Sequence, residues 1–469
     1  MSYAYAPPRL RAWPDDGFRL HSRSVNFDLR PWRFDLQQPP RTAGRLQAIE
    51  CRIAQEEKAK GVSRKKYLLF LLPGMLLPVG SLTHQPETPA EQPLAPADFV
   101  LRGTDDRAPL GSAAERRIRM ADRARQKYPY RFDLSELPRY EPKHIVSGVI
   151  RLWGNNYVGD SGLAGRWCAE FRRRHAKANC ELVLPTAAVA APSLYFGLAD
   201  LAMNHELTFY DYLAHVRILG FEPTGFSIVT GSYDVPGWQN SIAIVVHADN
   251  PLAGISMEQL DGVFGSARAG GWVGARWEPE FARGPEENIR TWGQLGLKGE
   301  WADKPINTYG YSLRYATSLE FSNRVLSSSD KWNENLLAYG NYVAEDGTRT
   351  GQADSIVGRL EEDRQGIAYL RWRPDFEDRV KVLQLSEQDG GPYYEFSVEN
   401  IQARRYPLWG DQSLWVSVRP GTQISPRAAE FIRFVLSREG QELVMEDGKY
   451  FPLPADAVTE QLNKLAGME

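Results

Sequence analysis

The stretch SIAIVVHADNPLAGISMEQLDGVF, residues 241–264, decides the fold class. Its first half is apolar without alternation, which is typical of a strand that helices cover on both faces. Asn250 and Pro251 end this strand, because proline has no N–H for a strand ladder. Ser256 and Gln259 then stand three residues apart, as in the capping box at the start of a helix. A buried strand, a turn and a capped helix together predict an α/β protein.

The same succession of elements appears upstream of this stretch. Residues 145–153 alternate like a strand, residues 163–175 carry apolar side chains at helical spacing, and residues 181–184 form the next short strand. A third strand region is expected over residues 197–203. This order predicts an open parallel sheet with helices on its faces. Near the carboxyl end, residues 426–445 have the apolar spacing of one amphipathic helix.

Length and charge narrow the function class. The chain has 469 residues, of which 42% are hydrophobic and 25% charged, so it can form two packed α/β lobes with extensions. Its 56 lysines and arginines nearly balance 59 aspartates and glutamates. Because no global charge attracts nucleic acid or an acidic membrane surface, we expect no nucleic-acid partner. Any anion that binds must be held by local groups.

Motifs for metal binding and catalysis are missing from the sequence. The seven histidines are scattered without an HExxH pair, and the three cysteines lack CxxC spacing. No Gly-x-Ser-x-Gly elbow and no phosphate loop of the GxxxxGK type occur. The sequence therefore predicts no metal site, no cofactor, no catalytic residue and no enzyme activity.

A basic and then apolar segment near the amino terminus resembles an export signal. Residues 63–66 read SRKK, residues 67–79 are largely apolar, and a stretch rich in proline and glutamate follows. We expect residues 62–83 to be a signal peptide, translation to begin near Val62, and residues 1–61 to be a non-native, disordered extension. The protein would then be periplasmic or extracellular. A buried core helix of a cytoplasmic protein is the alternative interpretation of the apolar run.

Export would change the expected redox state of the cysteines, because an oxidising compartment permits disulfides. If Cys51 is lost with the signal, Cys168 and Cys180 remain as an even pair. Cys168 lies on a predicted helix and Cys180 at the start of the next strand, so a bridge between them would tie the two elements together. Two buried free thiols are the alternative.

Six segments in the second half of the chain carry a family resemblance. They are residues 242–264, 291–297, 366–370, 406–408 with 413–418, 429–444 and 450–454. In this order they resemble the PstS-like phosphate-binding proteins of ABC transporters. The resemblance spans about residues 145–455.

The resemblance implies a fold and a function. The fold is the type II periplasmic-binding fold, with two α/β lobes and a ligand cleft between them; such lobes close around ligand by hinge bending. We place lobe one at residues 144–246 plus 405–469 and lobe two at residues 247–404, behind a proline-rich lead-in at residues 84–143. The function would be that of an exported, monomeric protein that captures a small oxyanion, phosphate foremost, for an ABC-transporter permease. The alternative is a sensor or interaction module with the same fold.

Binding a small oxyanion requires fixed donors that replace its hydration shell. Helix N-termini, turns, hydroxyl groups and an arginine are suitable donors. Three loops offer such groups: two follow predicted strands, and the third precedes a predicted amphipathic helix. They supply these candidates: Asn155, Asn156, Tyr157, Thr186, Ala187, Arg314 and Ser318.

Other candidates come from the resemblance. Residues 315–317, Tyr315, Ala316 and Thr317, stand where the family has Ser-Gly-Thr at a helix N-terminus, and Tyr311 stands where it has an arginine. Arg314 would then supply the missing charge. Asp200 matches the aspartate of the family's Ser-Asp, an acceptor that favours a protonated oxyanion.

Each candidate also has a structural alternative. Thr317 and Ser318 are suitable helix caps. Arg314 is suited to a solvated surface, and Asp200 to a structural ion pair or cap. The two asparagines tolerate turn conformations.

Overall fold

The computed structural model describes residues 121, 124–233, 235, 238, 241–343 and 349–469. All of them belong to one compact unit, Glu91–Glu469. The predicted extension at residues 1–61, the predicted signal peptide, Cys51 and most of the predicted lead-in lie outside the described residues.

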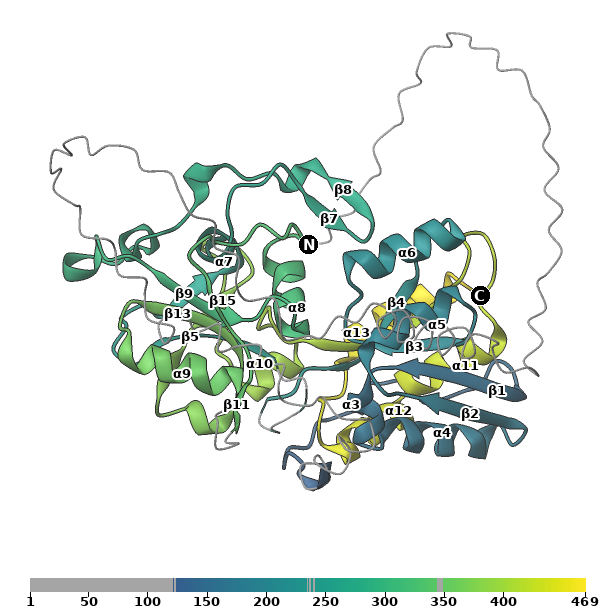
Figure 1. The fold of residues 1–469 in the computed structure, drawn as a ribbon. Helices are drawn as coiled ribbons and strands as arrows, with labels where there is room; N and C mark the ends of the chain where they lie inside the picture. The colour runs from purple at the N-terminus through teal and green to yellow at the C-terminus, as the bar shows by residue number, and fades with distance from the viewer. Residues whose placement is uncertain (1–120, 122–123, 234, 236–237, 239–240, 344–348) are drawn as a thin grey trace, which may run out of the picture. The chain divides into compact units, whose positions relative to one another are not determined.

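The first sheet has five strands in the order β2-β1-β3-β16-β4 (Figure 1). β1 runs parallel to β2 and β3, whereas β16 is antiparallel to β3 and β4. The strands are β1 (Gly148–Gly154), β2 (Ala178–Val183), β3 (Leu201–Asn204), β4 (Thr224–Thr230) and β16 (Asp411–Val416). The helices of this part are α3 (Asn156–Asp160), α4 (Leu163–Arg174), α5 (Ala190–Tyr195), α6 (Phe209–Leu219), α11 (Pro426–Leu436), α12 (Arg438–Asp447) and α13 (Ala455–Ala466).

The second sheet also has five strands, in the order β10-β9-β13-β5-β14. Its strands are β5 (Ile242–His247), β9 (Asn307–Tyr311), β10 (Leu337–Tyr339), β13 (Gly366–Arg371) and β14 (Val380–Val382). Its main helices are α7 (Met257–Phe264), α8 (Ala316–Val325) and α9 (Gln352–Glu362). The two sheets, each with its own helices, agree with the predicted two-lobed α/β fold class.

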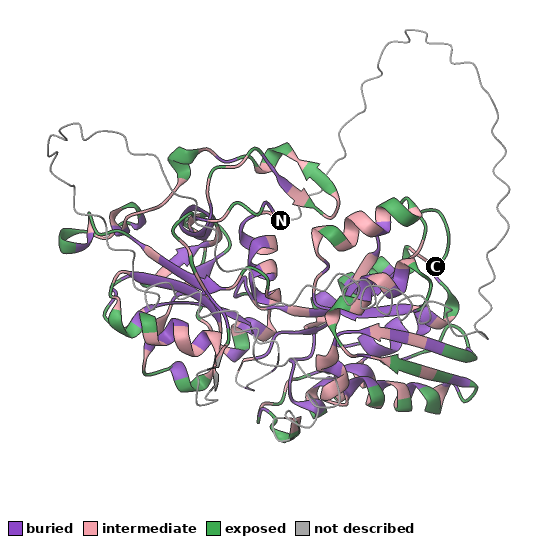
Figure 2. Ribbon diagram, in the orientation of Figure 1, coloured by how far each residue is buried: buried purple, intermediate pink, exposed green. Residues whose placement is uncertain are grey.

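Each sheet has its own hydrophobic core (Figure 2). In β5, all residues from Ile242 to Val246 are fully buried, as the unbroken apolar run predicted. The predicted capping box is also present: the N–H of Gln259 donates to Ser256 Oγ over 3.0 Å, and the N–H of Ser256 donates to Gln259 Oε1 over 3.1 Å.

The chain passes between the two sheets twice, from β4 to β5 and again ahead of β16. The two crossing segments are hydrogen-bonded to each other: the N–H of Gly231 donates to the carbonyl of Gly410 over 2.7 Å, and Ser241 Oγ donates to the carbonyl of Trp409 over 2.6 Å. A Cβ at position 231 would lie 2.1 Å from the Trp409 carbonyl oxygen, so only glycine fits there. These paired segments connect the lobes.

The structure corrects the predicted lobe boundary. β5 pairs with β13 and β14 of the second sheet, so lobe two begins before Ile242 and not at residue 247. The sequence misplaced it because a buried apolar strand fits the centre of either sheet equally well.

Two predicted elements are shorter than expected. The third strand begins only at Leu201, and residues 197–200 lead into it. The helix predicted over residues 426–445 is broken at Ser437, whose side chain accepts a hydrogen bond from the N–H of Gly440 and caps α12. Apolar periodicity continues through this break because both helices face the same core.

The described part of the lead-in belongs to the folded core. Tyr128 is buried in the core of the second sheet, while Leu134, Leu137 and Tyr140 are buried in the core of the first. Tyr128 Oη also donates to the carbonyl of Tyr450 over 3.0 Å.

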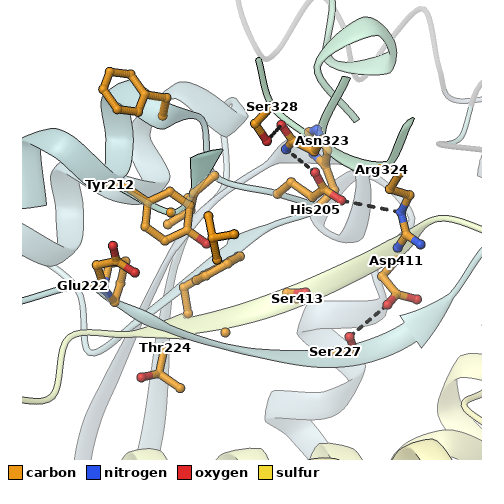
Figure 3. Close-up of a pocket in the computed structure, with 18 of the residues that line it drawn as sticks. His205, Tyr212, Glu222, Thr224, Ser227, Asn323, Arg324, Ser328, Asp411 and Ser413 are labelled. Atoms are coloured by element: carbon orange, nitrogen blue, oxygen red, sulfur yellow. Dashed lines mark hydrogen bonds and ion pairs between the residues drawn. The ribbon is translucent and has the colours of Figure 1, made fainter. Parts of the chain in front are cut away.

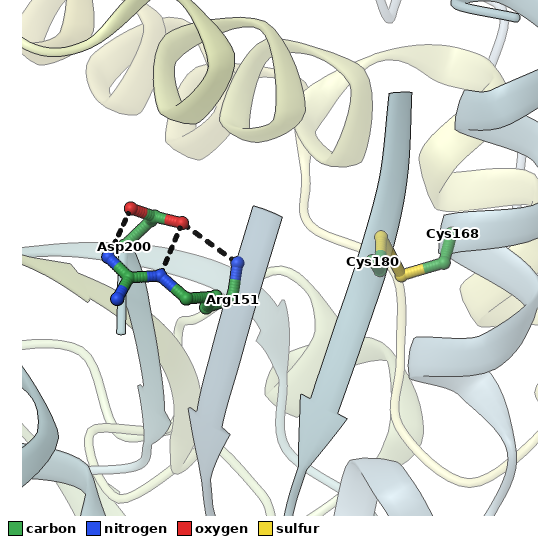
Figure 4. The surroundings of a disulfide bond; sticks show 4 residues. All are labelled: Arg151, Cys168, Cys180 and Asp200. Carbon is green, nitrogen blue, oxygen red and sulfur yellow. Dashed lines mark hydrogen bonds and ion pairs between the residues drawn. A yellow bond between two sulfur atoms is a disulfide. The ribbon is translucent and has the colours of Figure 1, made fainter. Parts of the chain in front are cut away.

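Cys168 of α4 and Cys180 of β2 form a disulfide with a Cα–Cα distance of 6.0 Å (Figure 4). The predicted bridge is therefore confirmed, and the alternative of two free thiols is wrong. In the part of the chain that the structure describes, no helix has the length and apolar character needed to cross a bilayer.

Candidate functional site

The carboxyl ends of β1 and β3 bring two buried polar residues together. The N–H of Asn155, after β1, donates to the carbonyl of Met203 in β3 over 2.9 Å, and His205 follows β3 directly. Asn155 is 1% exposed and His205 8%. Among the described residues, Asn155 Oδ1 and His205 Nδ1 have no hydrogen-bond partner. Unsatisfied buried polar atoms of this kind are available to a ligand.

A second group of side chains surrounds the start of α8. Arg371, at the end of β13, donates from Nε to Thr317 Oγ1 over 3.2 Å and from Nη2 to Glu320 Oε2 over 2.5 Å. Its backbone N–H donates to Tyr311 Oη over 3.0 Å. Thr317 is 7% exposed and Glu320 1%. The guanidinium is thus held by two side chains of α8, and the Arg371 backbone is bound to the end of β9.

The two groups meet across the lobes. Glu206 of lobe one lies 3.7 Å from Nε of Arg324 and accepts a hydrogen bond from Asn323, and both partners belong to α8 of lobe two. Glu320 and Arg371 are also close enough to His205 to perturb its pKa. The end of β3 therefore faces α8 and the end of β13.

Burial sets the protonation of the lobe-one residues. Burial lowers the pKa of His205 to about 4, with Glu320 and Arg371 acting in opposite directions, so the imidazole is neutral at pH 7. The Glu206 side chain retains 27% exposure, yet protein atoms surround it closely enough that burial raises its pKa to about 7 against the pull of Arg324. Glu206 therefore changes charge near neutral pH.

The charges around these residues nearly cancel. Burial opposes the charge on Arg324, but the neighbouring carboxylates outweigh burial and leave its pKa raised. Asp411 is held by Arg404 over 2.8 Å. Three carboxylates and three guanidinium groups make up the cluster: Glu206, Glu320, Asp411, Arg324, Arg371 and Arg404.

Some predicted site residues lie in this region. Asn155 is at the end of β1, Tyr311 and Thr317 contact Arg371, and Ala316 is the first residue of α8. Ser318 is fully buried and donates to the Tyr311 carbonyl over 2.9 Å, so its hydroxyl secures the loop before α8.

Asp200 is the main correction among the site residues. It precedes β3 and forms an ion pair with Arg151 at 2.9 Å (Figure 4). The structural alternative for this residue is therefore the right one. Four residues along a strand, about 13 Å, separate it from Asn204, so it lies at the other end of β3. Asn204 and His205 are the residues at the carboxyl end of β3, whereas Ala199 and Asp200 lay inside the strand region expected over residues 197–203.

The remaining predicted residues have partners or positions of their own. Asn156 donates to Asp160 within α3 over 3.0 Å, and Tyr157 packs edge-on against Trp238 at 6.3 Å. Thr186 is exposed, and Ala187 begins the short 3-10 helix η1 (Ala187–Val189).

On the second lobe, Tyr315 and Arg314 complete the set of predicted residues. Tyr315 is the N-cap residue of α8, and its Oη accepts from Asn341 over 3.1 Å. Arg314 is exposed on the loop that leads to the helix.

Sequence reasoning missed His205, Glu206, Glu320, Arg324 and Arg371. A signal for two of them exists: His205 directly follows buried β3, and Arg371 is the last residue of buried β13. A polar or charged residue directly after an apolar strand of an α/β sheet lies at the edge where ligands bind. Glu320 and Arg324 gave no such signal, because both lie within α8 and their partners, Arg371 and Glu206, are distant in the sequence.

A cavity of about 560 Å³ adjoins the cluster, and residues of both lobes line it (Figure 3). His205, Glu206 and Asp411 line it from lobe one, and Asn323 and Arg324 from lobe two. In the described residues, no group of three or more histidine, cysteine, aspartate or glutamate side chains could hold a metal ion.

Comparison with known proteins finds two similar proteins of the same name. The phosphate-binding protein PstS of Pseudomonas aeruginosa strain PAO1 is 27% identical over 332 residues, which cover 70% of this chain and 90% of that protein. PstS of strain UCBPP-PA14 gives the same values. No family model matches the chain.

Solved structures of low similarity also align. An ABC-type phosphate transport receptor from Vibrio cholerae has a TM-score of 0.40 at 16% identity, covering 66% of this chain and 100% of its own. PstS from Borrelia burgdorferi has a TM-score of 0.41 at 12% identity, covering 66% and 100%. With TM-scores below 0.5, neither structure bears on the residues of the site.

Proposed function

From the premise that this chain is a divergent PstS-like protein, we propose that it captures a small oxyanion, phosphate foremost, for an ABC transporter. The protein would act as an exported carrier without catalytic activity. Its ligand would lie between the ends of β1 and β3 on one lobe and the start of α8 on the other.

The observation that carries this proposal is the fixed guanidinium of Arg371 beside Thr317. A guanidinium held on two sides by Thr317 and Glu320 keeps its orientation when ligand binds, so little conformational entropy is lost. The first N–H groups of a helix have no partner within the helix, so the start of α8 at Ala316 adds backbone donors. Asn155 and His205 contribute unsatisfied polar atoms at the ends of β1 and β3, and His205 lies near enough to Arg371 for that charge to affect its pKa.

In this proposal, Arg371 takes the role expected of an arginine at position 311. Tyr311 at that position instead supplies the hydroxyl group that accepts from the Arg371 N–H. Arg314 is exposed on the loop ahead of α8 and is the second candidate for a positive group near the anion.

Export and a permease partner belong to the same proposal. The Cys168–Cys180 disulfide supports an oxidising compartment, and the basic and apolar run at residues 63–79 supports an export signal. Sequencing the amino terminus of the protein extracted from cells tests this. A mature chain that starts after residue 79 supports export, and one that starts at Met1 contradicts it.

Calorimetry tests ligand capture. The full chain is expressed, and the processed protein is titrated with inorganic phosphate and, separately, with sulfate. One-to-one phosphate binding with a Kd in the micromolar range or below supports the proposal. The absence of heat and of any thermal stabilisation by phosphate contradicts it.

One observation favours a second function. Tyrosines stand at positions 311 and 315, where the resemblance implies arginine and serine. A sensor or interaction module with this fold would tolerate such changes because it need not release its ligand to a permease. A protein that binds no anion in the calorimetric test supports this alternative.

A further inference from the structure

The cavity between the lobes is larger than a small oxyanion needs. Its volume is about 560 Å³, whereas a water molecule takes up about 30 Å³ of liquid and phosphate has only five heavy atoms. Cavities of about 300–1,000 Å³ are typical of sites for organic molecules. The space therefore suits a ligand with a body attached to its charged group.

The cavity adjoins the proposed anion site. His205 lines it, and His205 also lies near Arg371 and Glu320 of the anion site. Arg324 lines it from α8, one helical turn beyond Glu320. A ligand whose anionic end is held at Thr317 and Arg371 thus has room to extend past His205.

A hairpin of lobe two encloses the cavity on the side of α6. Its strands are β7 (Gly271–Val273) and β8 (Arg276–Glu278), and Val273 and Gly274 line the cavity. The N–H of Ala275 donates to Glu222 Oε1 of lobe one over 2.8 Å. Phe209 of α6 packs on Trp272 with ring centroids 4.4 Å apart. The hairpin thus holds the two lobes together beside the cavity.

The lining combines hydrogen-bond donors, acceptors and aromatic rings (Figure 3). Glu206 and Asp411 accept, Asn323 and Arg324 donate, and Ser413 does both. Tyr212 and Trp415 supply aromatic surface and pack edge-on with ring centroids 6.0 Å apart. Neutral groups that both donate and accept fit this surface, and hydroxyl groups on a carbon skeleton have that character.

From these contacts we propose that the protein binds a phosphate monoester of a polyol or sugar, with the hydroxylated body in the cavity. This rests on the proposed function, because the phosphoryl group would occupy the anion site at Thr317 and Arg371. Carboxylates and amides of the cavity would bind the hydroxyl groups, and Tyr212 and Trp415 would contact the C–H surface.

Calorimetry with three ligands separates this inference from the proposed function. The processed protein is titrated with inorganic phosphate, sn-glycerol 3-phosphate and glucose 6-phosphate. We expect at least one ester to bind tenfold or more tightly than inorganic phosphate. If inorganic phosphate binds as tightly as both esters or more tightly, the further inference fails and the proposed function stands. If none of the three binds, both fail.

Variants of the cavity provide the second test. Thr224→Trp fills part of the cavity and should weaken ester binding at least tenfold while phosphate affinity stays within twofold. Thr459→Trp places the same side chain at an exposed position of α13 and serves as the matched control. Tyr212→Ala removes one aromatic wall and should also weaken the esters alone. Equal ester affinity in both cavity variants and in the control, with native circular dichroism, overturns the inference.

Discussion

Arg371 and Thr317 are joined by a hydrogen bond of 3.2 Å between the end of β13 and the first turn of α8. The two residues are 54 positions apart in the sequence, and the same guanidinium is bound to buried Glu320. An anion site built on this pair takes its arginine from β13, which neighbours β9 in the sheet. The family resemblance instead implied an arginine at position 311, in β9.

This relationship predicts which arginine binds the anion. Arg371→Lys keeps a charge but loses the planar fork, and we expect it to weaken phosphate binding by about 1.5–3 kcal/mol, the range for a charge-assisted hydrogen bond. Arg314→Lys is the matched control on an exposed loop. Calorimetry of both variants decides the assignment. Loss of affinity in the Arg314 variant alone would transfer the role to Arg314.

The titration of Glu206 should make anion binding depend on pH. Its pKa of about 7 means that the carboxyl group is mostly charged at pH 8 and mostly neutral at pH 6, with Arg324, Glu320, Asp411 and Tyr212 around it. A charged Glu206 repels an anion nearby, so Glu206→Gln should bind phosphate several-fold more tightly than the native protein at pH 8.

The ratio of the two affinities at each pH is the measurement for Glu206. It cancels the titration of phosphate itself, because both proteins meet the same phosphate species. The ratio should approach one at pH 5.5, and a ratio independent of pH would contradict the assignment.

The lowered pKa of His205 should make the free energy of unfolding depend on pH. Burial lowers its pKa from 6.5 to about 4, so the unfolded chain binds more protons than the folded protein between these values. The contribution of neutral His205 is full above pH 6.5 and is lost as the pH falls toward 4. The loss is on the order of 3 kcal/mol, since one pKa unit is about 1.4 kcal/mol.

Chemical denaturation of the native protein and of His205→Gln, at pH 7 and pH 4.5, measures this contribution. The free energy of unfolding should fall less in the variant over this range. Parallel losses in the two proteins would show that other groups cause the acid sensitivity.

Removal of the disulfide should lower the free energy of unfolding without changing the affinity for phosphate. Cys168 and Cys180 are 12 positions apart, and closing so short a loop stabilises by about 2–3 kcal/mol. The Cys168→Ala, Cys180→Ala double variant should lose this amount in denaturant unfolding and retain phosphate affinity. Adding a reductant should lower the stability of the native protein to that of the variant. A native protein that is insensitive to reductant would contradict the bridge.

The burial of Tyr128 predicts that the lead-in contributes to the stability of the fold. It is 3% exposed and donates to the Tyr450 carbonyl, so Tyr128→Ala leaves a cavity and an unpaired acceptor. We expect a loss of about 3–5 kcal/mol, as for other buried aromatic residues. Tyr210, at 76% exposure, is the control, and Tyr210→Ala should change stability by less than about 0.5 kcal/mol. Equal effects in the two variants would place Tyr128 outside the core.

Local patterns in the sequence were enough to predict several parts of the fold. The apolar run at 242–246 gave a buried strand, Ser256 and Gln259 gave a capping box, and the cysteine pair gave a disulfide. Each depends on residues close in the chain or on a strand's own side chains. The family resemblance then supplied the two-lobed fold, which no single pattern contains.

The composition of the site could be predicted only in part. Asn155 was found because it follows a predicted strand, and Thr317 because of the family resemblance. Asp200 also came from the resemblance, but it precedes β3 and pairs with Arg151, whereas the expected strand region contained it. Strand ends carry little local signal, and an error of a few residues moves a side chain to the opposite edge of the sheet.

The amino-acid sequence by itself determined that this protein is an α/β chain with buried central strands, capped helices and one cysteine pair, because propensity and periodicity act over a few residues. Only the tertiary structure decided that Arg371 meets Thr317, that Glu206 faces Arg324, and that β5 belongs to the second sheet. These contacts join residues far apart in the chain. The charged groups of Glu206 and Arg324 become buried, and their pKa values shift, only after the two lobes have packed.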